Sequence, residues 1–277
     1  MLKEGVAVSR DASGDFYTTA SANTISAAVK ESGLQIGSVS SVPVEVSVVS
    51  SLQVAILKDG GMGKVQSHSG TKLALKRLGF DVTEVTPVDV AEKGLEGFDV
   101  LVYSGTENLI STNLSAANKE FGFQNPEQLT AFKDKVNSFV DNGGKYIAVG
   151  AGASRATWTL GLTDNEIKTA GSNSNGIVKV DYLGKGLTGG YGQDDFGFVY
   201  RPVWYTVKGN DEIAATLDNS EDFFVAGHWI NNKADAQGQA VIVKEENKDV
   251  TLIGLEAGFR DHTDYLFRLL SNAIFEN

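Results

Sequence analysis

The chain has 277 residues, 42% of them hydrophobic, and a formal net charge of −11 at pH 7. This composition is typical of a globular protein with a substantial core, and the length allows one large domain or two small ones. Lys and Arg are scattered along the sequence, so the basic surface that nucleic-acid binding requires is missing. The absence of cysteine excludes disulfides, thiolate metal sites and cysteine nucleophiles.

No apolar run is long enough to span a bilayer. The first residues, Leu2-Lys3-Glu4-Gly5, lack the apolar stretch of a signal peptide. We therefore expect no membrane span and no signal peptide within this sequence.

The first 50 residues differ in residue composition and pattern from the rest of the sequence. TISAAVKESGLQIGSV (residues 24–39) predicts a short helix that stops at Gly33. In SVSSVPVEVSVVSS (residues 38–51), Ser and Val are frequent, which indicates an edge strand or a linker. Its alternating valines, Val42, Val44, Val46 and Val48, predict a half-buried strand. We expect residues 1–50 to form a small N-terminal α/β segment or linker that packs on a main domain of residues 51–277.

The main domain begins with alternating strand and helix patterns. The helix pattern SGTKLALKRLG has Ser69 as a candidate N-cap and Gly79 as a C-terminal stop. Three buried strands are predicted in this region: LQVAILKD (residues 52–59), FDVTEVT (80–86) and FDVLVYSGT (98–106).

The clearest helix is NPEQLTAFKDKVNSFVDNGG (residues 125–144), with Asn125 as its cap, Pro126 in the first turn and Gln128 at the capping-box position. One apolar stripe runs along it: Leu129, Phe132, Val136, Phe139 and Val140.

The strand KYIAVG follows this helix. The β-α-β-α-β order predicts an α/β fold of flavodoxin-like, doubly wound type, with a mainly parallel sheet and helices on both faces. Residues 176–255 carry more strand than helix. The strand VTLIGLEAG and the amphipathic helix DYLFRLLSNAIF close the chain.

KYIAVGAGASRA (residues 145–156) predicts a buried strand, a tight glycine turn and a helix. In α/β enzymes a nucleophile is mounted at such an elbow, where helix N–H groups stabilise an oxyanion. The residue at the turn, Gly150, has no side chain. Ser154 is a near miss to the G-x-S-x-G pattern and falls inside the first helical turn. We interpret Ser154 as a capping or packing residue, with a nucleophile as the alternative.

Metal chemistry has little support in the motifs. Neither HExxH nor HxxE occurs around His68, His228 or His262. Surface or hydrogen-bonded histidines are the simpler interpretation, and a metal site assembled from distant residues is the alternative. Asp194-Asp195 lies in a glycine-rich loop without EF-hand spacing, and no P-loop is present. We predict no metal ligand and no cofactor in this chain.

The segment FRDHTD follows the strand VTLIGLEAG, where an α/β site is expected. Arg260, Asp261, His262 and Asp264 could contact a ligand there. They also suit the start of a helix, where acidic groups favour the N-terminal dipole. Both interpretations stay open.

The order of these motifs resembles the class I glutamine amidotransferase-like fold over about residues 52–277. It is most similar to the version that follows the catalytic domain of bacterial zinc carboxypeptidases of the carboxypeptidase A type. The resemblance is carried by LQVAILKDGG, LEGFDVLVYSGT, DNGGKYIAVGAGA, the VYRPVW segment from Val199 to Trp204, and the final FR-x-x-T and LL-x-NA motifs.

The family's catalytic residues do not carry over. The elbow cysteine of G-x-C-x-G corresponds to Gly150. No histidine stands near Glu256-Ala257-Gly258, where the catalytic one would be, although His262 lies four residues beyond Gly258. The resemblance therefore implies a non-catalytic accessory domain, the C-terminal region of an exported zinc carboxypeptidase-like protein. Zinc would belong to a separate peptidase domain, the partner of this one. The expected roles are binding of substrate, peptide or cell wall, and support of that domain. The expected location is extracellular, with a cytoplasmic one as the alternative.

Two other functions stay open. One is a hydrolase with Ser154 as nucleophile, His262 as base and Glu256 orienting the base. The other is a small-molecule or carbohydrate-binding module. Its candidate polar contacts are Ser104, Glu107, Gly150, Arg155 and Arg260. Trp158, Trp204 and Trp229 would be stacking platforms or, more simply, core residues.

Overall fold

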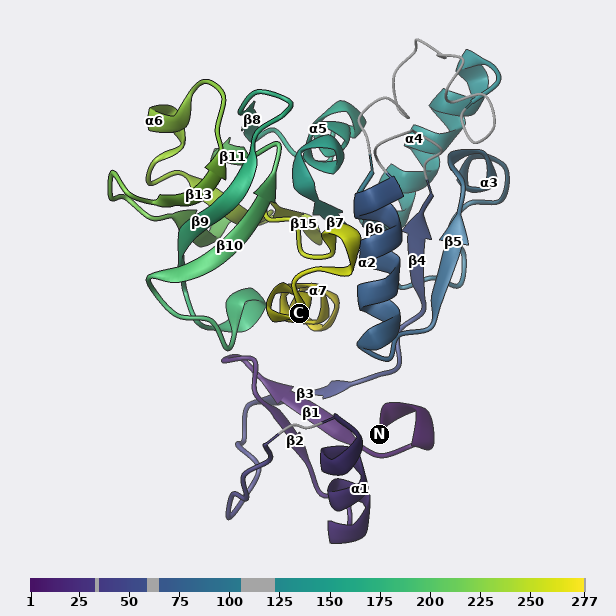
Figure 1. The fold of residues 1–277 in the computed structure, drawn as a ribbon. Coiled ribbons are helices and arrows are strands. Elements are labelled where there is room, and N and C mark those ends of the chain that lie inside the picture. The colour runs from purple at the N-terminus through teal and green to yellow at the C-terminus, as the bar shows by residue number, and fades with distance from the viewer. Residues whose placement is uncertain (33–34, 59–64, 106–122, 277) are drawn as a thin grey trace.

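The computed structural model describes residues 1–32, 35–58, 65–105 and 123–276. In this part of the chain a twelve-stranded sheet forms the main body, and a separate three-stranded sheet lies near the N-terminus (Figure 1). None of the described helices combines the length and apolar character needed to cross a bilayer.

The central part of the large sheet is parallel, as the sequence predicts. Its strands follow the order β5-β4-β6-β7-β15, so the first two strands in sequence are exchanged in space, as in flavodoxin-like sheets. The strands are β4 (Val54–Leu57), β5 (Val82–Val85), β6 (Val100–Tyr103), β7 (Lys145–Val149) and β15 (Val250–Ile253).

Helices cover both faces of this parallel part, which confirms the doubly wound architecture (Figure 1). Successive side chains of a strand point to opposite faces. Val54 and Ile56 therefore pack with α2 and α7, whereas Ala55 and Leu57 pack with the helices behind. The two front helices are α2 (Val65–Arg77) and α7 (Asp264–Phe275), and the three behind are α3 (Pro87–Lys93), α4 (Pro126–Asp141) and α5 (Gly150–Leu160).

Beyond β15 the sheet continues with antiparallel strands, in keeping with the strand-rich texture of residues 176–255. The order from this side is β10-β9-β12-β14-β15, with β8, β11 and β13 paired beside it. These strands are β8 (Glu166–Thr169), β9 (Asn175–Tyr182), β10 (Asp195–Tyr200), β11 (Val203–Thr206), β12 (Glu212–Leu217), β13 (Phe224–His228) and β14 (Ala240–Lys244). The short helices are α6 (Lys233–Ala236) and the 3₁₀ turns Leu2–Glu4, Gly186–Thr188 and Phe259–Asp261.

The α4 cap differs in one detail from the sequence prediction. Asn125 accepts a hydrogen bond from the Gln128 backbone N–H at 2.9 Å, as predicted. The Gln128 side chain accepts from the backbone N–H of Gln124 at 2.7 Å, one residue before the cap, instead of closing a capping box.

The prediction that Ser69 caps α2 is wrong, because the helix already begins at Val65. Ser69 and Gly70 are interior positions, and the pair resembles a helix start only in sequence. A Cβ at Gly70 would lie 1.8 Å from the carbonyl oxygen of Gly258. Only glycine lets α2 approach the loop after β15 this closely. The predicted stop is confirmed: Gly79 has φ +89°, and its N–H donates to the Lys76 carbonyl oxygen at 3.0 Å.

The N-terminal segment contains more strand than the sequence predicts. Its sheet has the order β2-β1-β3, and its elements are β1 (Val8–Asp11), β2 (Phe16–Thr18), α1 (Ala22–Ser32) and β3 (Val46–Val49). The helix matches the prediction, although the proposed stop at Gly33 lies outside the described residues.

The predicted half-buried stripe of alternating valines is wrong. Val44 is 100% exposed and Val48 80% exposed, whereas Val49 is buried. The register explains this result, because Arg10 pairs with Ser47 and Val8 with Val49. Since paired residues share a face of the sheet, the buried face is the one that carries Arg10 and Val49.

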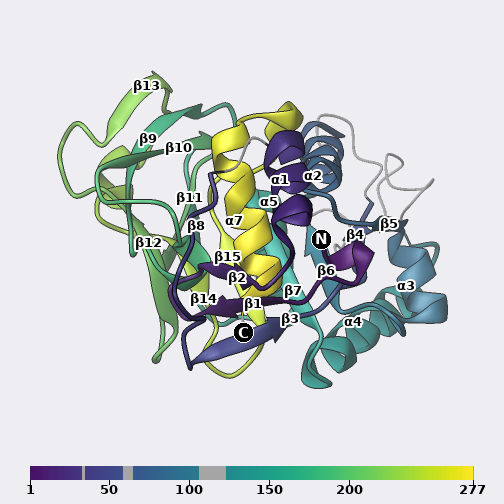
Figure 2. The same ribbon diagram turned by 90° about the horizontal axis from the view of Figure 1, so that it is seen from below.

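This buried face contacts the end of α7. The Arg10 guanidinium donates to the Glu276 carboxylate at 2.8 Å, to the Phe275 carbonyl oxygen at 3.1 Å and to the Gly186 carbonyl oxygen at 2.8 Å. The Phe16 ring meets Phe275 edge-on, with centroids 5.8 Å apart. Figure 1 and Figure 2 both show the segment beside the C-terminal end of α7.

Candidate functional site

The predicted elbow is present at the carboxyl end of the sheet. β7 ends at Val149, and α5 begins at the next residue, Gly150, which has φ +80°. The carboxyl ends of parallel strands are where ligands bind in open α/β sheets. The backbone therefore has the shape of an enzyme elbow, with a glycine at its apex.

A buried carboxyl group lies directly over this glycine. Glu256 follows β15, the strand beside β7, and its side chain is 4% exposed. A Cβ at position 150 would lie 2.4 Å from Glu256 Oε1. The Glu256 carboxyl therefore fills the space that a side chain at the elbow would need.

The neighbours of Glu256 set its protonation. Burial raises its pKa to about 7, although a hydrogen bond from Ser67 lowers it. The Ser67 hydroxyl, on α2, donates to Glu256 Oε2 at 2.9 Å. A carboxyl group that titrates near neutral pH can exchange a proton with a bound group under physiological conditions.

Ser154 is fully buried inside α5. Its hydroxyl donates to the Gly150 carbonyl oxygen at 2.8 Å and lies 2.8 Å from the Tyr205 hydroxyl. Burial raises the pKa of Tyr205 well above its usual value, so its phenol stays neutral and is a poor base.

His262 is exposed, just after the turn Phe259–Asp261. Among the hydrogen bonds of the described residues, none joins Ser154 to His262 or to Glu256. The predicted catalytic trio is therefore not connected in this structure.

The candidate ligand contacts lie in different settings. Ser104, directly after β6, is 2% exposed, and among the described residues its hydroxyl has no hydrogen-bond partner. The Arg155 guanidinium donates to Thr169 Oγ1 at 2.8 Å. Arg260 is exposed and lies 5.4 Å from the centre of the Phe259 ring. Glu107 lies outside the described residues.

The acidic residues of FRDHTD contact another helix. Arg77 at the end of α2 donates to Asp261 at 3.2 Å and to Asp264 at 2.9 Å, and Asp264 is the first residue of α7. These contacts fit the helix-start interpretation of the segment.

The histidines stand apart from one another. The His68 imidazole is bonded to Glu84 at 3.0 Å, His228 is exposed on β13, and His262 is exposed as well. Over the described ranges, two groups of carboxylates have oxygen atoms within 4.8 Å of one another, and neither includes a histidine. They are Asp164, Asp211 and Glu245, and Asp181, Asp194 and Asp218. Asp195, the neighbour of Asp194, accepts a hydrogen bond from the Tyr265 hydroxyl.

Two of the three tryptophans belong to the core. Trp204 is 2% exposed, and the Trp229 ring packs 6.3 Å from it, centre to centre. Trp158, on α5, is 58% exposed and could stack on a ligand.

Sequence reasoning missed Ser67 and Tyr205, which contact the elbow residues Glu256 and Ser154. No local motif marks either of them. The contact of Ser67 with Glu256 depends on the approach of α2 to the loop after β15, which only the folded chain shows.

Comparison with known proteins places the fold. No family model matches the sequence. A curated protein, the outer membrane protein SlpA of Deinococcus radiodurans, is 31% identical over 81 residues, a match that covers 26% of this chain and only 7% of that protein.

Several solved structures share the fold, including the two that follow. A putative GMP synthase subunit from Thermoplasma acidophilum superposes with a TM-score of 0.52 at 15% identity, covering 80% of this chain and 92% of its own. PurLQS from Thermotoga maritima gives 0.51 at 11% identity, covering 80% and 98%. The chain therefore has the fold of class I glutamine amidotransferases, and the residue at its elbow is Gly150.

Proposed function

We propose that this chain is a non-catalytic, amidotransferase-like domain that binds a ligand or supports a neighbouring domain in a larger protein. The observation that carries the proposal is the Glu256 carboxyl over Gly150, 2.4 Å from where a Cβ would lie. The residue at the elbow has no side chain, and the Glu256 carboxyl occupies the space that one would need.

The other groups do not replace the missing nucleophile. Covalent catalysis needs a nucleophile within hydrogen-bond reach of a base. Ser154 is bonded to a backbone carbonyl oxygen and a neutral phenol, and His262 is exposed. A hydrolase that uses this pair would require a rearrangement of both residues.

The experiment is activity and probe labelling of the purified chain. We expect no ammonia release from glutamine and no labelling of Ser154 by a serine-directed fluorophosphonate. Ser154→Ala tests the buried serine, and Ser138→Ala, at an exposed serine of α4, is the matched control. Labelling or turnover that Ser154→Ala abolishes and Ser138→Ala preserves would overturn the proposal and establish the hydrolase.

We further propose that the parent is an exported protein. Two facts support this: the motif order resembles the domain that follows zinc carboxypeptidases, and the curated relative is an outer membrane protein. In the carboxypeptidase version, a separate peptidase domain holds the zinc and is the partner of this chain.

An antibody against this chain, used on envelope, medium and cytosol fractions of the source cells, tests the location. Carboxypeptidase activity that co-purifies with the antigen and is lost with a zinc chelator supports the peptidase parent. An antigen confined to the cytosol contradicts export, and an exported antigen without such activity contradicts the peptidase parent alone.

A ligand-binding role at the carboxyl edge, rather than support alone, is favoured by Ser104. Leaving a buried hydroxyl without a partner costs free energy, and a ligand could supply the missing hydrogen bond. Thermal shifts with a panel of neutral sugars test this role. A shift that Ser104→Ala removes supports it, whereas no shift with any sugar contradicts carbohydrate binding.

A further inference from the structure

Two separate cavities border β3, and we call the two together the trough; the larger one lies at the opposite edge of the sheet from the elbow. One cavity, of about 530 Å³, is lined by Val48 and Val49 together with the amino ends of β6 and β7, at Val100 and Lys145. A second, of about 390 Å³, is lined by Val46 and Ser47. All four residues of β3 therefore face a cavity.

The backbone of β3 has an unused edge. Within the described ranges β3 pairs only with β1, so it ends the three-stranded sheet. The free N–H and C=O groups of an edge strand are a template for a further strand. An extended peptide can satisfy them by β-augmentation.

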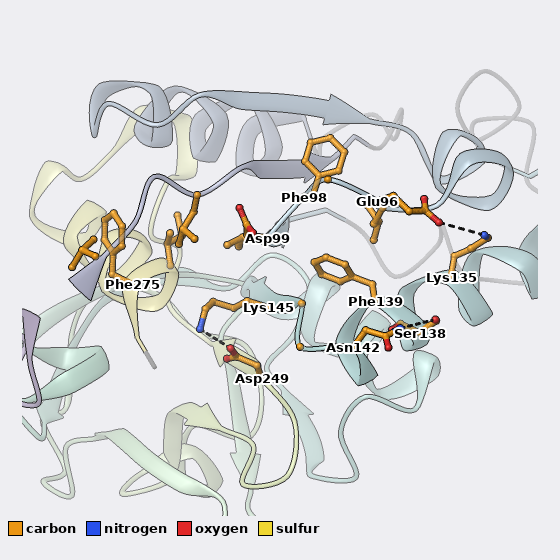
Figure 3. Close-up of a pocket in the computed structure, with 18 of the residues that line it drawn as sticks. Glu96, Phe98, Asp99, Lys135, Ser138, Phe139, Asn142, Lys145, Asp249 and Phe275 are labelled. Carbon is orange, nitrogen blue, oxygen red and sulfur yellow. Dashed lines mark hydrogen bonds and ion pairs between the residues drawn. The ribbon is translucent and has the colours of Figure 1, made fainter. Parts of the chain in front are cut away.

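The wall of the larger cavity facing β3 is partly aromatic. Figure 3 shows Phe98, Phe139 and Phe275 around it. All three rings are only partly buried, so they offer apolar surface to a ligand. The volume lies in the range of pockets that hold small ligands or a few side chains.

The trough is acidic. Six carboxylates line the two cavities: Glu96, Asp99, Asp249, Asp11, Glu45 and Glu276. The basic side chains are Lys135, Lys145 and Arg10, which leaves an excess of negative charge.

All three of these cations are already paired with carboxylates. The Lys145 ammonium lies 2.7 Å from Asp249 (Figure 3), and the Arg10 guanidinium 2.8 Å from Glu276. Lys135 lies 3.9 Å from Glu96 at the exposed rim. The charge left to attract a ligand is therefore negative.

We propose that this trough binds an extended basic peptide, in which apolar residues alternate with Lys or Arg, as an added strand on β3. Successive side chains of a strand point to opposite sides. One set would enter the aromatic cavity, and the other would meet the acidic rim. The proposal is independent of the elbow and would stand if the elbow proved catalytic.

The test is fluorescence anisotropy with a labelled, end-blocked hexapeptide of alternating Lys and Val, against its Glu and Val counterpart. We expect the basic peptide to bind the intact chain, and to bind less well at 500 mM than at 50 mM NaCl because salt screens the charges. The acidic peptide should not bind. Because an edge strand bonds through every second amide, N-methylation of one alternate set should abolish binding and methylation of the other should spare it.

Glu96→Lys is the informative variant, since its side chain is 77% exposed and the fold does not depend on it. We expect roughly two- to fivefold weaker binding of the basic peptide. Glu92→Lys, at an exposed position of α3 outside the trough, is the matched control and should bind like the wild type.

Four results would overturn the proposal. They are equal binding of the acidic and basic peptides, equal effects of Glu96→Lys and Glu92→Lys, unchanged binding of both methylated peptides, and no binding of the basic peptide. A dimer in solution that excludes the peptide would likewise overturn it, by assigning the β3 edge to a second copy of the chain.

Discussion

Replacing Gly150 by alanine tests the central feature of the site, the Glu256 carboxyl over the elbow. The substitution has two costs. Residue 150 has φ +80°, and an L-residue in a left-handed conformation costs about 1–2 kcal/mol. Its Cβ would also lie 2.4 Å from a carboxyl oxygen that is buried and cannot swing into water, and overpacking of this kind costs about 1–3 kcal/mol.

We therefore expect Gly150→Ala to lower the free energy of unfolding by about 2–5 kcal/mol. Gly161→Ala separates the two costs. Gly161 ends the same helix with φ +75°, and no atom lies within 4 Å of its would-be Cβ. Gly161→Ala should therefore lower the free energy of unfolding only by the conformational term, about 1–2 kcal/mol.

Urea denaturation followed by circular dichroism measures both variants. Repeating Gly150→Ala in a Glu256→Ala background completes a double-mutant cycle. Without the Glu256 carboxyl, Gly150→Ala should lower the free energy of unfolding by no more than Gly161→Ala does. The coupling free energy between positions 150 and 256 is then about 1–3 kcal/mol. Equal losses for Gly150→Ala and Gly161→Ala in the wild-type background would refute the placement of Glu256.

Three further outcomes are expected. Burial raises the pKa of Glu256 from 4.5 to about 7, so between these pH values the folded state binds a proton that the unfolded state has lost. The free energy of unfolding should therefore fall by about 3 kcal/mol relative to that of Glu256→Gln as the pH rises from 4.5 to 7. Parallel pH curves for the two proteins would contradict this. Arg10→Ala leaves the Glu276 carboxylate, which is 17% exposed, without its partner and should lower the free energy of unfolding by up to about 3 kcal/mol. We also expect faster proteolysis of residues 1–50 than in the exposed control Lys30→Ala; identical digestion patterns would argue against this contact. Gly70→Ala should lower the free energy of unfolding by about 3 kcal/mol, the upper part of the range for overpacking, even though alanine favours helices. Ser69→Ala, the control, should change it by less than about 0.5 kcal/mol. A stabilising effect of Gly70→Ala in urea denaturation would contradict the close approach of α2 to Gly258.

Local patterns determined much of the main domain. Buried strands such as β4 and β7 are continuous apolar runs, and α4 has both a cap and an apolar stripe, so sequence reasoning finds them. The glycine at the elbow was visible for the same reason, because a strand, a turn and a helix follow one another along the chain. The β1 and β2 strands were missed, since they are short and carry polar residues.

What the tertiary structure decided are the contacts between elements distant in sequence. Glu256 could be assigned to the end of a late strand from the sequence, but only the pairing of β15 with β7 puts its carboxyl on Gly150. The close approach of α2 to Gly258, which requires glycine at position 70, likewise depends on the folded chain. The burial of Val49 instead of Val48 depended on which face of β3 meets α7. Hydrophobic periodicity and helix capping depend on residues that are neighbours in the sequence. Strand order and the choice of the buried face of a strand depend on the whole chain.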